Sequence, residues 1–135
     1  MDFDNDNKDE ILTGPDQGAP HIQMFSLRTG YVHRLNPGFY AFSSEYRGGV
    51  SLTGADIDGD GRDEIVVAVG DDAQPEVKVY NKYGGTILDQ FYAFSKTFLG
   101  GVNFSGGDVD DDGIDEIIVA PRSDGGPNVR IIDNN

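Results

Sequence analysis

The chain has 135 residues and carries 24 Asp and Glu against 10 Lys and Arg, which gives a formal net charge of −14. This acidic balance excludes a nucleic-acid-binding surface, which needs basic side chains, and it argues against binding to anionic membranes. With 37% hydrophobic residues, gathered in short β-branched and aromatic runs, the chain is expected to fold as one compact unit that holds cations.

Membrane insertion is not expected, because the longest apolar runs, IVVAV and IIVA, are far too short to cross a bilayer. The first ten residues, MDFDNDNKDE, contain neither a basic region nor an apolar core, so no signal peptide is visible. The chain has no cysteine, so its redox compartment cannot be deduced from disulfides.

Two motifs repeat along the chain. An acidic motif occurs as DFDNDNKDEIL from Asp2, DIDGDGRDEIV from Asp56 and DVDDDGIDEII from Asp108. An aromatic motif occurs as FYAFSSEYRGGV from Phe39 and as FYAFSKTFLGGV from Phe91. Both recur with a period slightly above 50 residues, and a period of this length with several short strands is typical of propellers and solenoids.

The middle period predicts four antiparallel strands in chain order. Residues 48–56 form the first strand, and the acidic motif then leads into the apolar stretch 64–70, which is expected to be a buried central strand. Residues 76–81 alternate as a half-buried third strand, and residues 86–94 form the outer strand. No stretch has helical periodicity of convincing length, so the chain is predicted to be all-β.

Four antiparallel strands per period correspond to one propeller blade. The first copy begins at the acidic motif without a preceding strand, and the last copy ends after NVRII without a fourth strand. We therefore predict a single unit of about ten strands and about two and a half blades: a partial blade at 1–47, a full blade at 48–99 and a partial blade at 100–135. Such a chain forms an incomplete ring.

The acidic motif is predicted to be a cation-binding loop. Counted from its first Asp, it places side-chain oxygens at positions 1, 3, 5 and 9, a backbone carbonyl at position 7, and Gly or Asn at the tight position 6. A hard cation that takes 6–8 oxygens, Ca²⁺ before Mg²⁺, suits this set. The predicted ligands of up to three ions are Asp2, Asp4, Asp6, Glu10, Asp56, Asp58, Asp60, Glu64, Asp108, Asp110, Asp112 and Glu116, with the carbonyls of Lys8, Arg62 and Ile114.

Other metal-site and active-site interpretations fit less well. An EF-hand needs a bidentate Glu at position 12, but that position is Val67 in a predicted strand. A phosphatase with an Asp nucleophile needs one such site with basic and hydroxyl partners, whereas this chain has three equivalent loops. Zinc is not expected, since the chain has no Cys and only two scattered His.

The pattern Asp-x-Asp-x-Asp-Gly-x-x-Asp/Glu before an apolar strand, within a four-strand repeat, resembles the FG-GAP/VCBS repeats of integrin-type β-propellers. The Gly-Gly-Val and Phe-Tyr-Ala-Phe-Ser segments are similar to bacterial forms of that repeat. The resemblance covers nearly the whole chain. It implies calcium in the loop between the first two strands of each blade, and an extracellular or cell-surface protein of adhesion type. Glu stands at position 9, where Asp is commoner, and Asn7 replaces Gly in the first copy.

The remaining polar and aromatic residues are interpreted structurally. The Asp at position 8 of each loop and the fourth residue of the last loop are expected to be turn residues or solvated charges, and both His to lie on the surface: Asp9, Asp63, Asp115, Asp111, His21 and His33. The Phe-Tyr-Ala-Phe segments are expected to pack between blades rather than form a ligand platform.

The sequence therefore predicts a calcium-binding propeller module that is not an enzyme and that recognises a protein or glycan at a cell surface. One alternative is a fragment of a lyase or hydrolase built on a propeller, but no unrepeated cluster of charged residues indicates an active site. Another is a purely structural or engineered self-assembling repeat unit. Unpaired sheet edges and bare apolar flanks predict self-association into a homo-oligomer.

Overall fold

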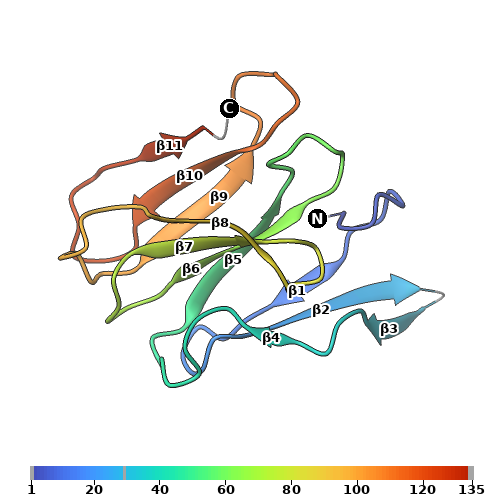
Figure 1. Ribbon diagram of the computed structural model, residues 1–135, viewed down its shortest axis with the longest axis horizontal. Coiled ribbons are helices and arrows are strands. Elements are labelled where there is room, and N and C mark those ends of the chain that lie inside the picture. Colours follow the sequence, from blue (N-terminus) through green and yellow to red (C-terminus); the bar gives the residue numbers. More distant parts are fainter. Residues whose placement is uncertain (1, 29, 134–135) are drawn as a thin grey trace.

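The structure is a computed structural model that describes residues 2–28 and 30–133. Figure 1 shows three antiparallel sheets lying side by side along the chain. The described part of the chain contains no helix, and its strands are β1 (Ile11–Thr13), β2 (His21–Arg28), β3 (Tyr31–Arg34), β4 (Phe39–Tyr40), β5 (Val50–Ala55), β6 (Glu64–Val69), β7 (Glu76–Tyr80), β8 (Ile87–Tyr92), β9 (Val102–Gly107), β10 (Glu116–Pro121) and β11 (Arg130–Ile132).

The middle sheet is a complete four-stranded meander in the order β5-β6-β7-β8. Every residue of β6 is buried, because this strand is central in its sheet and has a neighbouring sheet on each face. β7 buries alternate residues and β8 is largely exposed, as expected for a strand at the outer edge. The four strands agree with those that the sequence predicts for this period.

The first sheet has a broken outer strand. β2 pairs with β1 on one side, and on the other side with β3 over Phe25–Arg28 and with β4 over His21–Ile22. Between β3 and β4 the buried side chain of Asn36 hydrogen-bonds to β2 in place of a strand backbone. Its Oδ1 accepts from the backbone N–H of Met24 in β2 and from that of Gly38. Pro37, which has no N–H to donate, and Gly38, at φ 86°, explain why a regular strand cannot continue. The described residues therefore form eleven strands, in agreement with the predicted number of about ten, and the break in this outer strand accounts for the difference.

The third sheet contains three strands in the order β11-β10-β9. β10 pairs with β9 over Glu116–Pro121 and with β11 over Ile117–Val119. The fold class predicted from the sequence is confirmed. The described chain is all-β, with antiparallel sheets of three or four strands that match partial propeller blades and do not close a ring.

The hydrophobic core lies between the sheets in two layers. β6 contributes side chains to both layers, because successive residues of a strand point to opposite faces of the sheet. Ile65 and Val67 face the first sheet, and Val66 and Ala68 face the third. The first layer contains Phe3, Leu12, Ile22, Met24, Ala41, Val50, Ile65, Val67 and Tyr80, and the second contains Ala55, Val66, Ala68, Val77, Val79, Ala93, Val102, Ile117 and Val119. Each sheet is therefore held mainly by its neighbour, as in a stack of blades.

The Phe-Tyr-Ala-Phe segments fasten each sheet to the next one. Lys78 of β7 lies over the ring of Phe42, and its Nζ donates to the carbonyl of Ala41. One repeat later, Arg130 of β11 lies over the ring of Phe94 and donates to the carbonyl of Ala93. The prediction that these segments pack between blades is confirmed, and the sequence analysis missed the cation, Lys78 of β7 or Arg130 of β11, that the next sheet places over each segment.

Candidate metal centres

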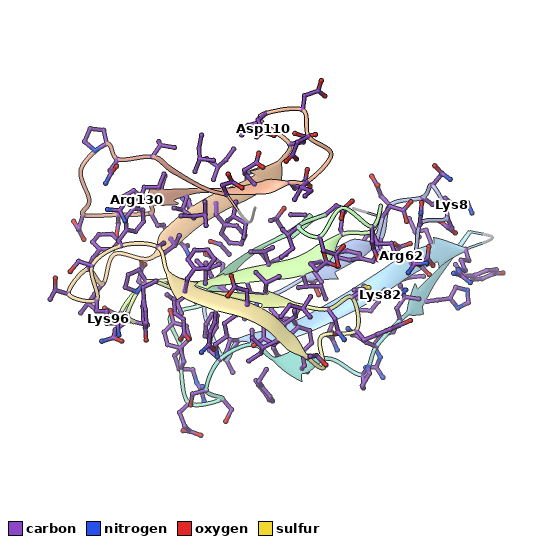
Figure 2. The ribbon with its side chains drawn as sticks, turned by 45° about the horizontal axis from the view of Figure 1, so that its top comes forward. Lys8, Arg62, Lys82, Lys96, Asp110 and Arg130 are labelled. Atoms are coloured by element: carbon purple, nitrogen blue, oxygen red, sulfur yellow. The ribbon has the colours of Figure 1, made fainter. Side chains whose placement is uncertain are left out.

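The three acidic loops lie at the same ends of the three sheets. Residues 56–63 join β5 to β6, residues 108–115 join β9 to β10, and residues 2–10 lead into β1. Figure 2 shows Lys8, Arg62 and Asp110, one residue from each loop, along one side of the molecule. Strands of equal direction in neighbouring sheets thus bring all three sets of carboxylates to one edge.

The first Asp of each loop closes the turn. In the middle loop Asp56 Oδ1 accepts from the N–H groups of Gly59 and Asp60, and its Oδ2 accepts from Gly61 at 2.8 Å. In the third loop Asp108 makes the corresponding bonds, with Gly113 at 2.9 Å. In the first loop Asp2 accepts from positions 5 and 6. The carboxylate at position 1 is therefore fixed by backbone donors before any ion is considered.

Two positions of each loop need the left-handed backbone region. At position 6, φ is 83° for Gly61, 91° for Gly113 and 63° for Asn7, which confirms that Asn is tolerated there. Position 4 is left-handed as well, with Asn5, Gly59 and Asp111 at φ between 59° and 73°. Asp111 thus has a conformational role in the turn. The recurrence of Gly, Asn and Asp at position 4 was the signal for it.

Three carboxylates converge in each loop, with one ligand oxygen from each lying within 4.8 Å of the others. Oxygens that share one Ca²⁺ at about 2.4 Å can be at most about 4.8 Å apart, so these distances suit a common ion. The converging sets are Asp2, Asp4 and Asp6 in the first loop, Asp56, Asp58 and Glu64 in the middle loop, and Asp108, Asp110 and Glu116 in the third.

The predicted ligands at position 5 lie outside the converging sets of the middle and third loops. Asp60 instead accepts from the N–H of Arg62, and its Oδ2 lies 3.9 Å from the Arg62 guanidinium. Asp112 likewise accepts from the N–H of Ile114. Glu10 lies outside the set of the first loop. The side chains at positions 1 and 3 are thus brought together in every loop, whereas the third partner differs.

The Glu at position 9 is buried in all three loops, with exposed fractions of 6% for Glu10 and Glu64 and 2% for Glu116. One oxygen, Oε2, accepts from the N–H of position 2, at 2.9 Å for Phe3, 3.2 Å for Ile57 and 2.8 Å for Val109. The other oxygen of Glu116, Oε1, is buried without a hydrogen-bond partner among the described residues. A buried carboxylate oxygen without a donor is costly and needs a cation or proton.

Burial of carboxylates within these clusters shifts their pKa values. Desolvation raises the pKa of Glu64 to about 7, and the negative charge of Asp58 adds to the rise. Desolvation also raises the pKa of Glu10, with a further contribution from Asp4. At Asp2 burial again opposes ionisation, but backbone donors led by the N–H of Asn7 lower the pKa below its usual value. Burial therefore disfavours the charged forms of Glu10 and Glu64, whereas backbone donors favour the charged form of Asp2.

The Asp at position 8 bonds to the loop before it. Asp63 Oδ2 accepts from the N–H of Asp2 at 3.0 Å, and Asp63 N–H donates to the Asp2 carbonyl. Asp115 makes the same pair of bonds with Asp56, at 3.0 and 2.7 Å. The sequence predicts these two residues to be turn residues or solvated charges, and the second alternative is wrong, because both are half-buried between loops. The Asp-Glu doublet that ends all three motifs was the available signal.

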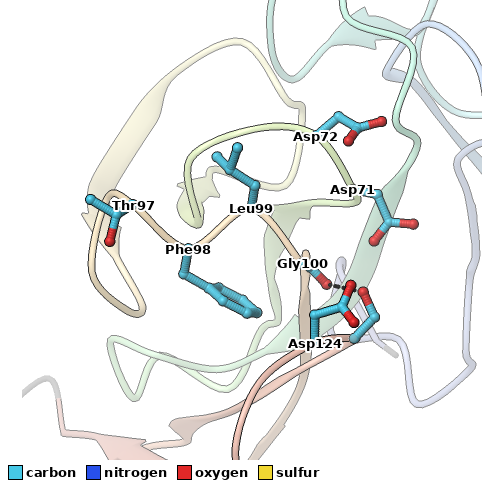
Figure 3. Close-up of a pocket in the computed structure, with 8 residues that line it drawn as sticks. Asp71, Asp72, Thr97, Phe98, Leu99, Gly100 and Asp124 are labelled. Atoms are coloured by element: carbon cyan, nitrogen blue, oxygen red, sulfur yellow. Dashed lines mark hydrogen bonds between the residues drawn. The ribbon is translucent and has the colours of Figure 1, made fainter.

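A cavity of about 530 Å³ lies at the opposite ends of the strands. Figure 3 shows its lining, which includes Asp71, Asp72 and Asp124 around the backbone of Gly100. The Ser123 hydroxyl donates to the Gly100 carbonyl at 3.1 Å and so serves to hold the loop. These acidic residues do not belong to any group of converging ligand atoms found among the described residues. The cavity is therefore separate from the candidate metal centres.

The comparison with known families agrees with this geometry. Residues 2–67 match the model of the FG-GAP-like repeat. The chain carries an FG-GAP-like repeat. The matched stretch includes the first acidic loop, the whole first sheet and the middle acidic loop with most of β6. Neither curated proteins nor solved structures gave a match. No helix in the described part of the chain has the length and hydropathy of a membrane span.

Proposed function

We propose that this chain is a calcium-binding propeller module whose three acidic loops each hold one Ca²⁺ in a structural role. The observation that carries the proposal is the buried Oε1 of Glu116, which has no donor within residues 2–28 and 30–133, in a side chain that belongs to the same converging set as Asp108 and Asp110. A divalent ion would satisfy this oxygen and offset the repulsion among the three carboxylates. The first loop supports the same conclusion, since Asp4 Oδ1 is also buried and has no hydrogen-bond partner in the part of the chain that the structure describes.

Calcium suits the loops better than magnesium. Each short turn brings three carboxylates together and so supplies several oxygens to one point. Ca²⁺ accepts six to eight oxygens in variable geometry. Mg²⁺ demands near-octahedral geometry and retains several waters, so it uses fewer protein ligands. The residues that would hold the ions are the converging sets together with Asp60, Asp112 and Glu10 after a small rearrangement, and the carbonyls at position 7.

The role proposed for the ions is to hold loops and sheets together. Each loop leads directly into a strand of its sheet, and the bonds of Asp63 and Asp115 join the middle and third loops to the loops before them. An ion bound only to the folded loops would stabilise the folded state by mass action. The module is proposed to act by recognition and not as an enzyme.

The recognition partner that we propose is a protein or glycan outside the cell or at its surface. FG-GAP-like repeats support that location, and the outer strands offer exposed aromatic side chains. Tyr31 of β3 is 72% exposed, and Tyr40 of β4 and Tyr92 of β8 are also exposed. Aromatic side chains with a polar tip are favoured in such contacts, because they bury a large area at low entropic cost.

Calorimetric titration of the chelator-treated protein with CaCl₂ and with MgCl₂ tests the proposal. We expect about three binding events for calcium and much weaker binding of magnesium. Glu116→Gln should remove one calcium event, because it removes a charge from a converging set. Glu45→Gln is the matched control, since Glu45 is exposed and lies outside the three converging sets. Absence of calcium binding at millimolar concentration would disprove the proposal.

A further inference from the structure

Neighbouring acidic loops are joined by a pair of hydrogen bonds that occurs twice. At one junction the Asp63 carboxylate accepts from the N–H of Asp2, and the Asp63 N–H donates to the Asp2 carbonyl. At the other junction Asp115 makes the same two bonds with Asp56. The bonded residues are 61 and 59 positions apart in the sequence, so the contacts are tertiary. Because both junctions have the same geometry, the pairing is a built feature of the repeat.

The two residues bonded at each junction stand at different positions of their loops, one at position 8 and the other at position 1. Asp115 stands between Ile114 and Glu116, which are two predicted ligands of the third loop. Its partner Asp56 is the first ligand of the middle loop, and the Asp56 carboxylate also organises the turn at Gly59 and Gly61. An ion that fixes residues 114 and 116 therefore also fixes Asp115, and through it the peptide group that carries the first ligand of the neighbouring loop.

The loops are also in close contact through side chains. A Cβ atom at Gly59 would lie 3.2 Å from Ile114 Cγ1, and one at Gly61 would lie 3.4 Å from Asn5 Nδ2. The turn of the middle loop thus fits against both of its neighbours. Ile114 of the third loop therefore lies beside the Gly59 turn, and a side chain added at Gly59 would crowd it.

We propose that Asp63 and Asp115 are positioning residues that couple cation binding between neighbouring loops, so that an ion in one loop raises the affinity of the loop before it. The inference rests on the proposed calcium binding and adds to it that the three sites are not independent. Coupling through a shared element is reciprocal, so occupancy of the middle loop also favours occupancy of the third.

Amide signals at position 6 allow each loop to be followed separately. The N–H groups of Gly61 and Gly113 donate to the first carboxylate of their own loops, so each ¹H–¹⁵N resonance should report the ion in that loop. The experiment is a CaCl₂ titration of the full chain by NMR, with wild type, Asp115→Ala, Glu116→Gln and the double variant.

We expect Asp115→Ala to weaken calcium binding at Gly61 about tenfold, as loss of an outer-shell partner typically does, with a smaller loss at Gly113. Glu116→Gln, which disables the third loop, should weaken binding at Gly61 roughly fivefold in the wild-type background. In the Asp115→Ala background the same change should have no further effect at Gly61. A residue with a purely structural role would not abolish that dependence.

Two further variants keep the test decisive. Asp115→Asn retains an acceptor oxygen and should titrate within about twofold of wild type. Asp111→Asn removes an equal charge from the same loop at a position that tolerates Asn, and should leave Gly61 unchanged. The coupling is disproved if Glu116→Gln leaves the Gly61 titration unchanged, a result that does not depend on whether Asp115→Ala folds. If neither glycine responds to calcium in the wild type, the proposed function fails as well.

Discussion

In the first acidic loop the carboxylates that converge stand at positions 1, 3 and 5, whereas in the middle loop they stand at positions 1, 3 and 9. The sequences of the two loops differ little, but their surroundings differ. Asp4, at position 3 of the first loop, is half-buried and bonded to Arg28 of β2 at 3.1 Å, whereas Asp58 in the middle loop is exposed. β2 extends eight residues and reaches the loop, whereas β7 ends after five.

The surrounding sheets show the same contrast. β1, an edge strand of the first sheet, starts with Ile11, which is 45% exposed, while the equivalent Ile65 of β6 is fully buried. The outer strand of the first repeat is broken at Asn36, while that of the middle repeat, β8, is a single strand. The motif thus specifies the conformation of the turn, and contacts with the surrounding strands accompany the difference in which of its carboxylates converge.

The largest difference is expected for the equivalent isoleucines. Ile65→Ala leaves a cavity in the layer between the first two sheets and should lower the free energy of unfolding by about 2–5 kcal/mol. Ile11→Ala removes a side chain that is about half exposed to solvent, and should change the free energy of unfolding by less than about 1 kcal/mol. Urea unfolding of both variants in the presence of calcium measures the comparison. Equal losses would mean that Ile11 is buried in solution.

Removal of calcium from a single loop should have the next largest effect. At calcium concentrations about 100 times the dissociation constant, each ion adds about 2.7 kcal/mol to the stability of the folded state, so excess chelator should lower the melting temperature by on the order of 10 °C per loop. Asp58→Ala should remove one such contribution, and Asp4→Ala a smaller one, because the Arg28 charge already competes with an ion at Asp4. Thermal melts monitored by circular dichroism decide this, and an unchanged curve in chelator would contradict it.

The pH dependence of the chelated protein should follow Glu64. Because burial raises its pKa to about 7 from an ordinary 4.5, folded Glu64 keeps a proton that the unfolded chain has lost between these values. The ion-free protein should therefore become more stable as pH falls from above 7 towards 4.5, on the order of 1–2 kcal/mol, and lose this as pH rises through 7. Glu64→Gln should flatten the profile. With calcium bound the dependence should reverse, since protons then compete with the ion.

A smaller effect is expected at the first loop. Arg28→Gln removes a positive charge 3.1 Å from Asp4 and should raise the calcium affinity of that loop by about two- to threefold at low salt. The amide of Asn7, which donates to Asp2, would report the change in an NMR titration. The middle loop is the internal control, because its Gly61 signal should titrate as before. Weaker binding at Asn7 would show that Arg28 orders the loop rather than opposing the ion.

The weakest effect is expected for association. Val129, just before β11, and Ile131 of β11 are exposed by 64% and 57%, although Val77 and Val79, their equivalents in the middle sheet, are fully buried. We propose that a second copy packs its Ile11 face on this surface, repeating the contact between the middle and third sheets. Sedimentation at micromolar concentration with calcium should show dimers or larger species, and Ile131→Asp should abolish them. A monomer at all concentrations would contradict the proposal.

The sequence by itself determined the local structure. The period slightly above 50 residues, the Gly and Asn at position 6 and the apolar run of β6 specify turns and strands, because these depend on backbone conformation and on the alternation of side chains. For the same reason the converging residues at positions 1 and 3 could be predicted, since they lie within a few residues of one another on one turn.

Only the tertiary structure decided the features that depend on neighbours distant in sequence. Asp63 and Asp115 look like solvated charges in the motif, but they are half-buried because the next loop lies against them. The first loop, whose converging set includes position 5 rather than position 9, also differs from the middle loop in the bond of its Asp4 to Arg28 of β2. Long-range packing and desolvation act between sheets, and no spacing within a single repeat encodes them.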